Sequence, residues 1–247
     1  MTSIRVGIVA MLCTVTGFMP TSLDARDATT SGEAVTARLL ASLLKIGRAV
    51  VSEHQAAINN PTDGAKGFTG AYVGKLVSAR FLGQELIDLR IPDSTAQTVL
   101  LRSLLESEKE VVDSFQVVIN RPGIGFKGFP PAVFARQTSE RFFEKTGIRL
   151  KLTGADSRVA DNKPDEFETQ VLRMFADPRH PKGQHYVKVT SVSGKPVMRV
   201  VDPEYAATSC LTCHGSPKGE RDIAGMAKEG WREGDLAGAI SLTIPLR

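Results

Sequence analysis

Apolar residues recur at helical spacing in two long stretches of the first half of the chain. Between residues 29 and 58, and again between 92 and 119, they return every three or four positions, which predicts two amphipathic helices. The first stripe comprises Val35, Leu39, Leu40, Leu43, Val50, Val51, His54 and Ile58. The second comprises Leu100, Leu101, Leu104, Leu105, Val111, Val112 and Phe115. Ser94 is the predicted N-cap of the second helix, because Gln97 follows it at capping-box spacing.

The two helices belong to an internal repeat. Residues 50–81 recur as residues 111–142, an offset of 61 positions. The identities across the turn-rich breaks are Gln55/Gln116, Ile58/Ile119, Asn59/Asn120, Pro61/Pro122, Gly64/Gly125, Lys66/Lys127, Gly67/Gly128 and Phe68/Phe129. Two units are too few for a solenoid. The repeat therefore predicts a duplicated helical hairpin, in which the glycines permit the turn and the phenylalanine side chain packs into it.

After residue 147 the apolar period changes from helical spacing to two. Alternating segments predict strands at 148–154 and 236–246 and a hairpin at 184–203, whose turn lies at Ser193 and Gly194. A helix is predicted at 162–177, with Asn162 as its cap. Helices followed by an antiparallel sheet indicate an α+β fold. We divide the chain into a helical region at 26–129 and a sheet domain at 130–247.

The first 25 residues have the pattern of an export signal. Arg5 supplies a positive start, residues 6–19 form an apolar stretch, and Ala25 offers a cleavage point. The alternative is a retained membrane anchor. A signal peptide would direct the chain to the periplasm or otherwise out of the cytoplasm, and its removal would take Cys13 with it. No later segment reaches the length of apolar residues that a spanning helix needs, so we expect no membrane span in the mature chain.

The overall charge changes this interpretation little. The formal net charge is +4, and the lysines and arginines are spread along the chain without a dense basic run. Nucleic acid is therefore not an expected partner. The sequence also shows no Ser/His/Asp or paired-carboxylate constellation, so nothing in it calls for an enzyme. A peroxidase-like activity would need an open iron position and a distal acid–base group, for which His54 is the candidate.

The residues that indicate a chemical function lie in one segment of five, residues 210–214. Cys210 and Cys213 are separated by two residues, and His214 follows directly. This Cys-x-x-Cys-His pattern is typical of c-type haem attachment. Two residues in a tight turn place the sulfurs at the separation of the two porphyrin vinyl groups, and the next residue can bind iron. We therefore expect one covalent haem c, with thioethers at Cys210 and Cys213 and with His214 as the proximal ligand. Attachment outside the cytoplasm agrees with the export signal.

Two other chemistries use closely spaced cysteines. Zinc usually needs four nitrogen or sulfur ligands, and His180 or His185 would have to complete the set. Adjacent Cys213 and His214 suit one tetrahedral ion poorly, and no second Cys-x-x-Cys follows. A thiol–disulfide couple usually lies in a βαβ unit, which the surrounding sequence does not predict. Both alternatives stay open at this point.

The C-terminal half resembles the PAS-like, single-haem c-type cytochrome family, whose members are free periplasmic proteins or sensor domains of bacterial chemoreceptors and histidine kinases. The matching pieces are "FFEKTGIRLKLTG", "DNKPDEFETQVLRMF", "VMRVVDPEYAATSCLTCHG" and "EGDLAGAISLTIPL". They cover about residues 130–247. The resemblance implies a PAS-like antiparallel sheet that holds haem, with the three residues of the motif in the roles given above.

The iron needs a second axial ligand, for which the sequence offers several candidates. Some relatives supply a cysteine from an upstream helix, but the mature chain has no third cysteine. The candidates are His54, His185, Met198 and Met226, beside water or an open position. Arg199 is a candidate partner for a haem propionate, because arginine pairs bidentately with carboxylates. Trp231 is interpreted as a core residue rather than a haem contact.

Two functions follow from a covalent haem in an exported protein. The leading hypothesis is a redox- or gas-responsive sensor or binding module that signals through a partner protein. The alternative is a periplasmic cytochrome that transfers one electron between redox partners, with the axial ligands tuning its potential.

Overall fold

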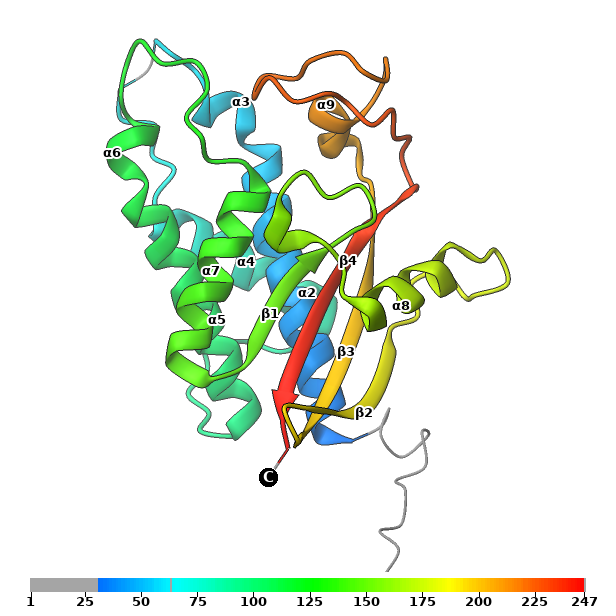
Figure 1. Ribbon diagram of the computed structural model, residues 1–247. Coiled ribbons are helices and arrows are strands. Elements are labelled where there is room, and N and C mark those ends of the chain that lie inside the picture. The colour runs from blue at the N-terminus through cyan, green and yellow to red at the C-terminus, as the bar shows by residue number, and fades with distance from the viewer. Residues whose placement is uncertain (1–30, 63, 247) are drawn as a thin grey trace, which may run out of the picture.

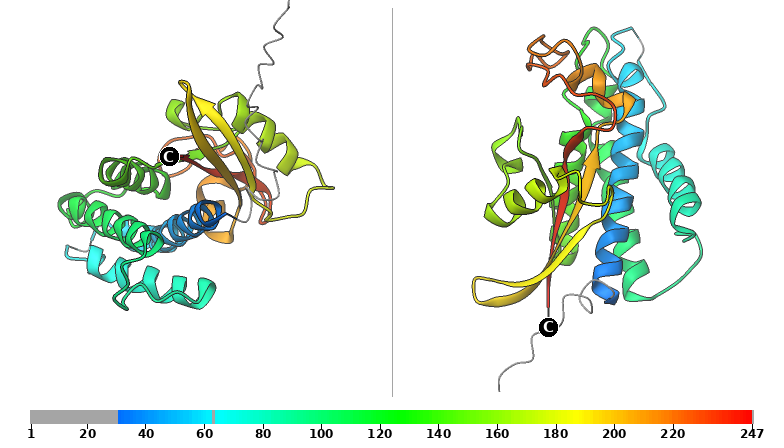
Figure 2. Two further views of the ribbon diagram at one scale, coloured as in Figure 1. Left: turned by 90° about the horizontal axis from the view of Figure 1, so that it is seen from below. Right: turned by 90° about the vertical axis from the view of Figure 1, so that its right-hand side faces the viewer.

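The computed structural model describes residues 31–62 and 64–246. The predicted signal peptide and Cys13 lie outside the described residues. The predicted α+β fold is confirmed. A layer of long helices covers one face of a four-stranded antiparallel sheet, and one shorter helix covers the other face (Figures 1 and 2).

The helical layer is built around α2 (Gly32–Glu53), which packs on the sheet and on each of the remaining long helices. These are α4 (Gly70–Glu85), α5 (Ala96–Ser114) and α7 (Pro131–Thr146), and the short helices α3 (Gln55–Ile58) and α6 (Gln116–Ile119) follow α2 and α5. Most of the predicted apolar stripe on α2 is buried, because that helix has neighbours on several sides. The helical layer runs to residue 146, so the expected boundary at 129 falls inside the second hairpin.

The two helical hairpins repeat the same elements at the offset of 61. In both, a one-residue break at His54 or Phe115 precedes a four-residue helix, and a glycine with positive φ, Gly67 or Gly128, precedes the next long helix. Reciprocal hydrogen bonds join the hairpins, namely Gln55 Nε2 to Phe129 O (3.0 Å), Gln116 Nε2 to Phe68 O (2.7 Å), Lys127 N to Asn59 Oδ1 (2.9 Å) and Lys66 N to Asn120 Oδ1 (3.1 Å). Each repeat thus satisfies backbone groups of the other.

The sheet has the strand order β1-β4-β3-β2, with every neighbouring pair antiparallel. The strands are β1 (Arg149–Thr153), β2 (Tyr186–Val192), β3 (Lys195–Tyr205) and β4 (Leu236–Pro245). Successive side chains of β3 alternate between the two faces. Met198 and Val200 join the large core shared with the helices, whereas Val201 packs with α8 (Glu166–Ala176) on the other face.

Two helices begin later than the sequence predicts. Helix α5 is capped by Thr95 rather than Ser94, because the Thr95 hydroxyl accepts from Thr98 N at 3.3 Å. Helix α8 is capped by Asp165 rather than Asn162, which lies in the 3-10 turn η1 (Ala160–Asn162). Pro164 disfavours helical geometry in the residue before it, so the helix starts only after the proline.

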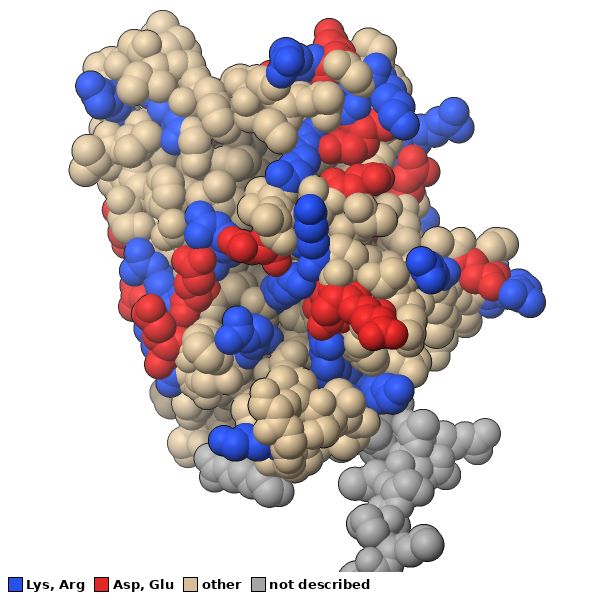
Figure 3. Space-filling view, in the orientation of Figure 1, with Lys and Arg blue, Asp and Glu red and all other residues tan. Residues whose placement is uncertain are grey.

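Within the described ranges, no helix combines the length and apolar content that crossing a bilayer requires. On the face that Figure 3 shows, acidic and basic side chains are interspersed over the helices and around the upper loops. This mixture gives the visible surface no single sign of charge.

Candidate haem-binding site

The Cys-x-x-Cys-His motif forms one helical turn at the end of the sheet. After β3 the chain enters the 3-10 turn η2 (Thr208–Cys210) and continues into α9 (Leu211–His214) (Figure 1). Residues three and four apart share a helix face, so Cys210, Cys213 and His214 project from one side of this turn. Both thiols are half-buried and unbridged. Ser52 Oγ of α2 donates to Ser209 Oγ at 3.0 Å and ties the turn to the helical layer.

The imidazole of His214 is held on one edge and one face. Its Nδ1 lies 2.7 Å from Glu229 Oε2, and its ring stacks on Trp231 with 4.4 Å between ring centroids and 9° between planes. The backbone N–H groups of Gly230 and Trp231 both donate to the His214 carbonyl at 2.9 Å. Trp231 is therefore a neighbour of the motif, not the core residue that the sequence suggested.

The protonation of this pair follows from its surroundings. Burial and the charge of Arg158 lower the pKa of His214, and the hydrogen bond with Glu229 opposes them only in part. Burial alone would raise the pKa of Glu229, but hydrogen bonds from Arg158 and His214 lower it overall. Both directions favour a neutral imidazole that donates from Nδ1 to an ionised Glu229. This tautomer leaves the lone pair of Nε2 for a metal ion.

Arg158 organises the loop that surrounds the motif. It belongs to the segment between β1 and α8. Its guanidinium reaches five acceptors, namely Glu229 Oε1 (2.6 Å), Glu229 Oε2 (2.8 Å), Asp222 Oδ2 (2.6 Å), Cys213 O (2.8 Å) and Ala227 O (3.1 Å). The Asp222 side chain is 1% exposed and also accepts from the N–H groups of Ala224 and Met226. One cation therefore fixes both the motif and the loop that follows it.

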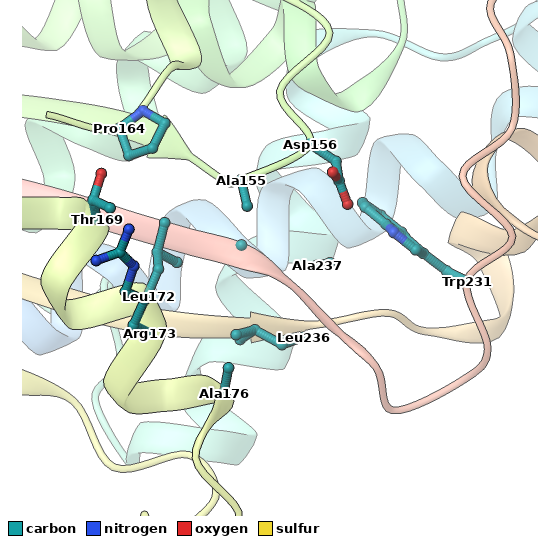
Figure 4. Close-up of a pocket in the computed structure, with 11 residues that line it drawn as sticks. Ala155, Asp156, Pro164, Thr169, Leu172, Arg173, Ala176, Trp231, Leu236 and Ala237 are labelled. Atoms are coloured by element: carbon teal, nitrogen blue, oxygen red, sulfur yellow. The ribbon is translucent and has the colours of Figure 1, made fainter.

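A cavity of about 520 Å³ lies beside the motif, on the face of the sheet that α8 covers (Figure 4). Trp231 forms part of its wall, so the cavity begins one side chain away from His214. The lining residues are Ala155, Asp156, Pro164, Thr169, Leu172, Arg173, Ala176, Trp231, Leu236, Ala237 and Gly238. Arg173 and Asp156 are the charged members of this set, and the rest are mostly apolar, as in pockets that bind cofactors.

The candidate sixth ligands lie elsewhere. His54 faces α4, where Nδ1 is 2.7 Å from Val50 O and Nε2 is 3.1 Å from the Tyr72 hydroxyl. Ser52 contacts the motif turn, and residues two apart on a helix point in different directions. Both ring nitrogens of His54 are thus engaged on the far side of α2 from the motif.

The other three candidates have equally distinct surroundings. Met198 is 3% exposed in the core between the sheet and the helices. His185 precedes β2, and burial lowers its pKa, while nearby Asp202 opposes that effect. Met226 is 41% exposed on the loop after the motif. None of these residues, nor His54, lines the described cavity.

Arg199 is held by acidic residues of the protein itself. Its guanidinium donates to Asp165 Oδ2 at 2.7 Å and to Glu168 Oε1 at 3.0 Å, and it covers the ring of Phe167. It therefore braces the start of α8 against β3. Arg173 of α8, at the cavity wall, is better placed for a carboxylate in that cavity.

The histidines that zinc would need are engaged separately. His180 Nε2 lies 3.2 Å from Gln184 O and its ring packs on Phe175, while His185 adjoins Asp202. Within the part of the chain that the structure describes, no group of three or more histidine, cysteine or acidic side chains is arranged to hold a metal ion.

Sequence reasoning missed the residues that support the motif. Arg158 lies 55 positions before Cys213, and Glu229 lies 15 positions after His214. No periodicity or spacing connects these residues. The one sequence feature close to the motif is the "EGW" segment at 229–231, where the chain folds back onto His214.

The fold and the site define an α+β protein with a helical turn of two cysteines and a histidine at one end of an antiparallel sheet. The model of the Tll0287-like family matches residues 27–245, and the chain belongs to that family. Among solved structures, the chain is similar to the cyanobacterial heme-protein Tll0287, with 17% identity, a TM-score of 0.42, and coverage of 60% of this chain and 92% of that one. No curated protein matches the chain.

Proposed function

We propose that the protein carries one covalent haem c, bound by thioethers to Cys210 and Cys213 and by His214 Nε2 to iron. The observation that carries this proposal is the contact of His214 Nδ1 with Glu229 Oε2, because an imidazole that donates from Nδ1 to this carboxylate leaves Nε2 for the metal. Membership of a family named after a haem protein supports it. Haem, once bound, would supply a one-electron redox couple and a site for small diatomic ligands.

The residues fit such a group. Two thiols and an imidazole share one face of the turn, as attachment to the two vinyl groups and the iron of one haem requires. Trp231 supports the imidazole ring, and Arg158 keeps the Cys213 carbonyl and Glu229 in place. Arg199 is held by Asp165 and Glu168, so we assign Arg173, at the wall of the cavity, as the partner of a propionate that reaches it.

The proposal extends to cell location and ancestry. Residues 1–25 would act as a signal peptide that exports the protein to the compartment where c-type haem is attached. The sheet with α8 on one face would be a PAS-like ligand-binding module. The paired hairpins would derive from a duplication, which the identities at an offset of 61 and the matched helix boundaries support.

We propose a redox- or gas-responsive sensor as the role of the protein. His54 is engaged by Val50 and Tyr72, and Met198 is buried in the core, which supports a coordination position that an external ligand can reach. One-electron transfer is the second candidate, and the exposed Met226 on the loop after the motif favours it, because a thioether is an axial ligand typical of electron-transfer cytochromes.

The first test is haem staining of a denaturing gel after production with the c-type haem maturation machinery. We expect a band that stains for haem in the wild type and in a His180→Ala control, and no staining in Cys210→Ala/Cys213→Ala. An unstained wild type, or a stained double variant, would contradict covalent attachment. With reduced protein, rapid binding of carbon monoxide supports the sensor, whereas a six-coordinate spectrum that carbon monoxide leaves unchanged supports electron transfer.

A further inference from the structure

Arg158 and His214 share one acceptor. Glu229 Oε2 lies 2.8 Å from Arg158 Nη2 and 2.7 Å from His214 Nδ1, while Glu229 Oε1 lies 2.6 Å from Arg158 Nε. The guanidinium therefore grips the carboxylate side-on with two nitrogens, and the imidazole must use an oxygen that is already engaged. Negative charge on that oxygen is divided between two donors.

A carboxylate on Nδ1 normally makes an imidazole a stronger donor to its metal. Stronger donation stabilises Fe(III) relative to Fe(II) and lowers the midpoint potential. A guanidinium on the same carboxylate works in the opposite direction, because it withdraws electron density from the acceptor and adds a positive charge close to the iron ligand.

The charges around His214 determine in which direction each substitution should shift the midpoint potential. Arg158 is paired with two carboxylates, Glu229 and the nearly inaccessible Asp222, so the cluster carries one net negative charge. Loss of the Arg158 charge would leave two negative charges beside the imidazole. Loss of the Glu229 charge would leave a neutral Arg158–Asp222 pair.

We propose that Arg158 is a positioning residue that sets the haem midpoint potential through Glu229 and His214. This inference rests on the proposed function, since it needs His214 as an iron ligand. It assigns Arg158 a role beyond the support of the loop. Glu229 lowers the potential, and Arg158 limits how far it does so.

The test is a potentiometric titration of purified haem-loaded protein, in which iron takes one electron from dithionite as Fe(III) becomes Fe(II). We compare the wild type with Arg158→Gln, Arg158→Lys, Glu229→Gln and Arg179→Gln. The last variant is the matched control, because Arg179 is 89% exposed, pairs with Asp177 and loses the same unit charge. Covalent haem is quantified in every sample before its potential is measured.

We expect the potential to fall in Arg158→Gln, to fall less in Arg158→Lys, to rise in Glu229→Gln and to stay unchanged in Arg179→Gln. A residue that only braces the loop would reduce haem loading or thermal stability without shifts of opposite sign. If Arg158→Gln takes up no haem, Arg158→Lys carries the test, and a wild-type potential in that variant overturns the inference.

The outcomes separate this inference from the proposed function. An absence of covalent haem in the wild type contradicts the function itself. Fully loaded variants whose potentials match the wild type, or shift in the same direction for Arg158→Gln and Glu229→Gln, leave the haem protein intact and overturn the role of Arg158.

Discussion

The helical layer and the loop around the motif are stabilised in different ways. The helices bury large side chains such as Phe81, Phe134 and Phe142 completely. Between residues 206 and 235, all of which the structure describes, Ala206 is the one apolar side chain that is buried. The loop depends instead on the contacts of Arg158, Glu229 and Asp222. Apolar burial spreads stability over many side chains, whereas this loop concentrates it in one ion cluster.

The two regions should also respond differently to substitution. A substitution that changes the volume of a core side chain changes the free energy of unfolding, because the neighbouring side chains are closely packed. A charge in the loop changes the electrostatic surroundings of His214 with little effect on the core. Variants in the helical layer should therefore alter the free energy of unfolding and leave the haem potential alone, whereas variants in the ion cluster should shift the haem potential.

The largest expected effect comes from truncating a buried aromatic side chain in the helical core. Phe142→Ala removes a fully buried aromatic ring and should reduce the free energy of unfolding by about 3–5 kcal/mol. Phe81→Ala, at the equivalent position of the first hairpin, should cost a similar amount. Urea denaturation measures both. A loss below about 1 kcal/mol in either variant would show that the layer does not rely on burial at that site.

A buried acid in the same layer should give a smaller effect of opposite sign. Glu108 of α5 lies against Gly47 of α2, where a Cβ on Gly47 would be 2.5 Å from Glu108 Oε1. Both carboxyl oxygens are buried and have no hydrogen-bond partner among the described residues. Glu108→Met should therefore raise stability at pH 8 by about 1–3 kcal/mol.

The dependence on pH identifies the cause of that gain. Complete burial raises the pKa of Glu108 well above its usual value. Below the unfolded-state pKa, Glu108 is protonated in both the folded and the unfolded protein, and the wild type has its full stability. As pH rises from there through the higher folded-state pKa, the wild type loses free energy of unfolding. The advantage of Glu108→Met should accordingly grow between pH 4 and pH 8. The control Glu106→Gln, at an exposed acid of the same helix, should show no such growth; an advantage independent of pH would contradict the explanation.

The smallest effect tests whether the two hairpins are equivalent. Gln55 and Gln116 each donate to the backbone carbonyl of a phenylalanine in the opposite hairpin. Gln55→Ala and Gln116→Ala should each cost about 1 kcal/mol, the usual contribution of such a hydrogen bond. Thermal and urea denaturation of the two single variants give the comparison. Costs that differ by more than about 1 kcal/mol would show that the repeats have diverged in energy while keeping their geometry.

The features that depend on nearby residues could be predicted from the sequence. Helical and alternating periods identified the long helices and the strands, and the repeat identified the matching hairpins, because each pattern reflects contacts within one element. The pairing of Cys210, Cys213 and His214 on one turn also followed from spacing alone. Even the errors were local, since the caps at Thr95 and Asp165 lie one and three residues from the predicted positions.

The tertiary structure alone decided the surroundings of the motif. Arg158 and Glu229 meet at His214 only because the β1–α8 segment and the loop before β4 converge at the same end of the sheet. Arg199 turned to Asp165 and Glu168 because odd-numbered residues of β3 face α8. Long-range electrostatic contacts have no period along the chain, so their partners become visible only once the chain has folded.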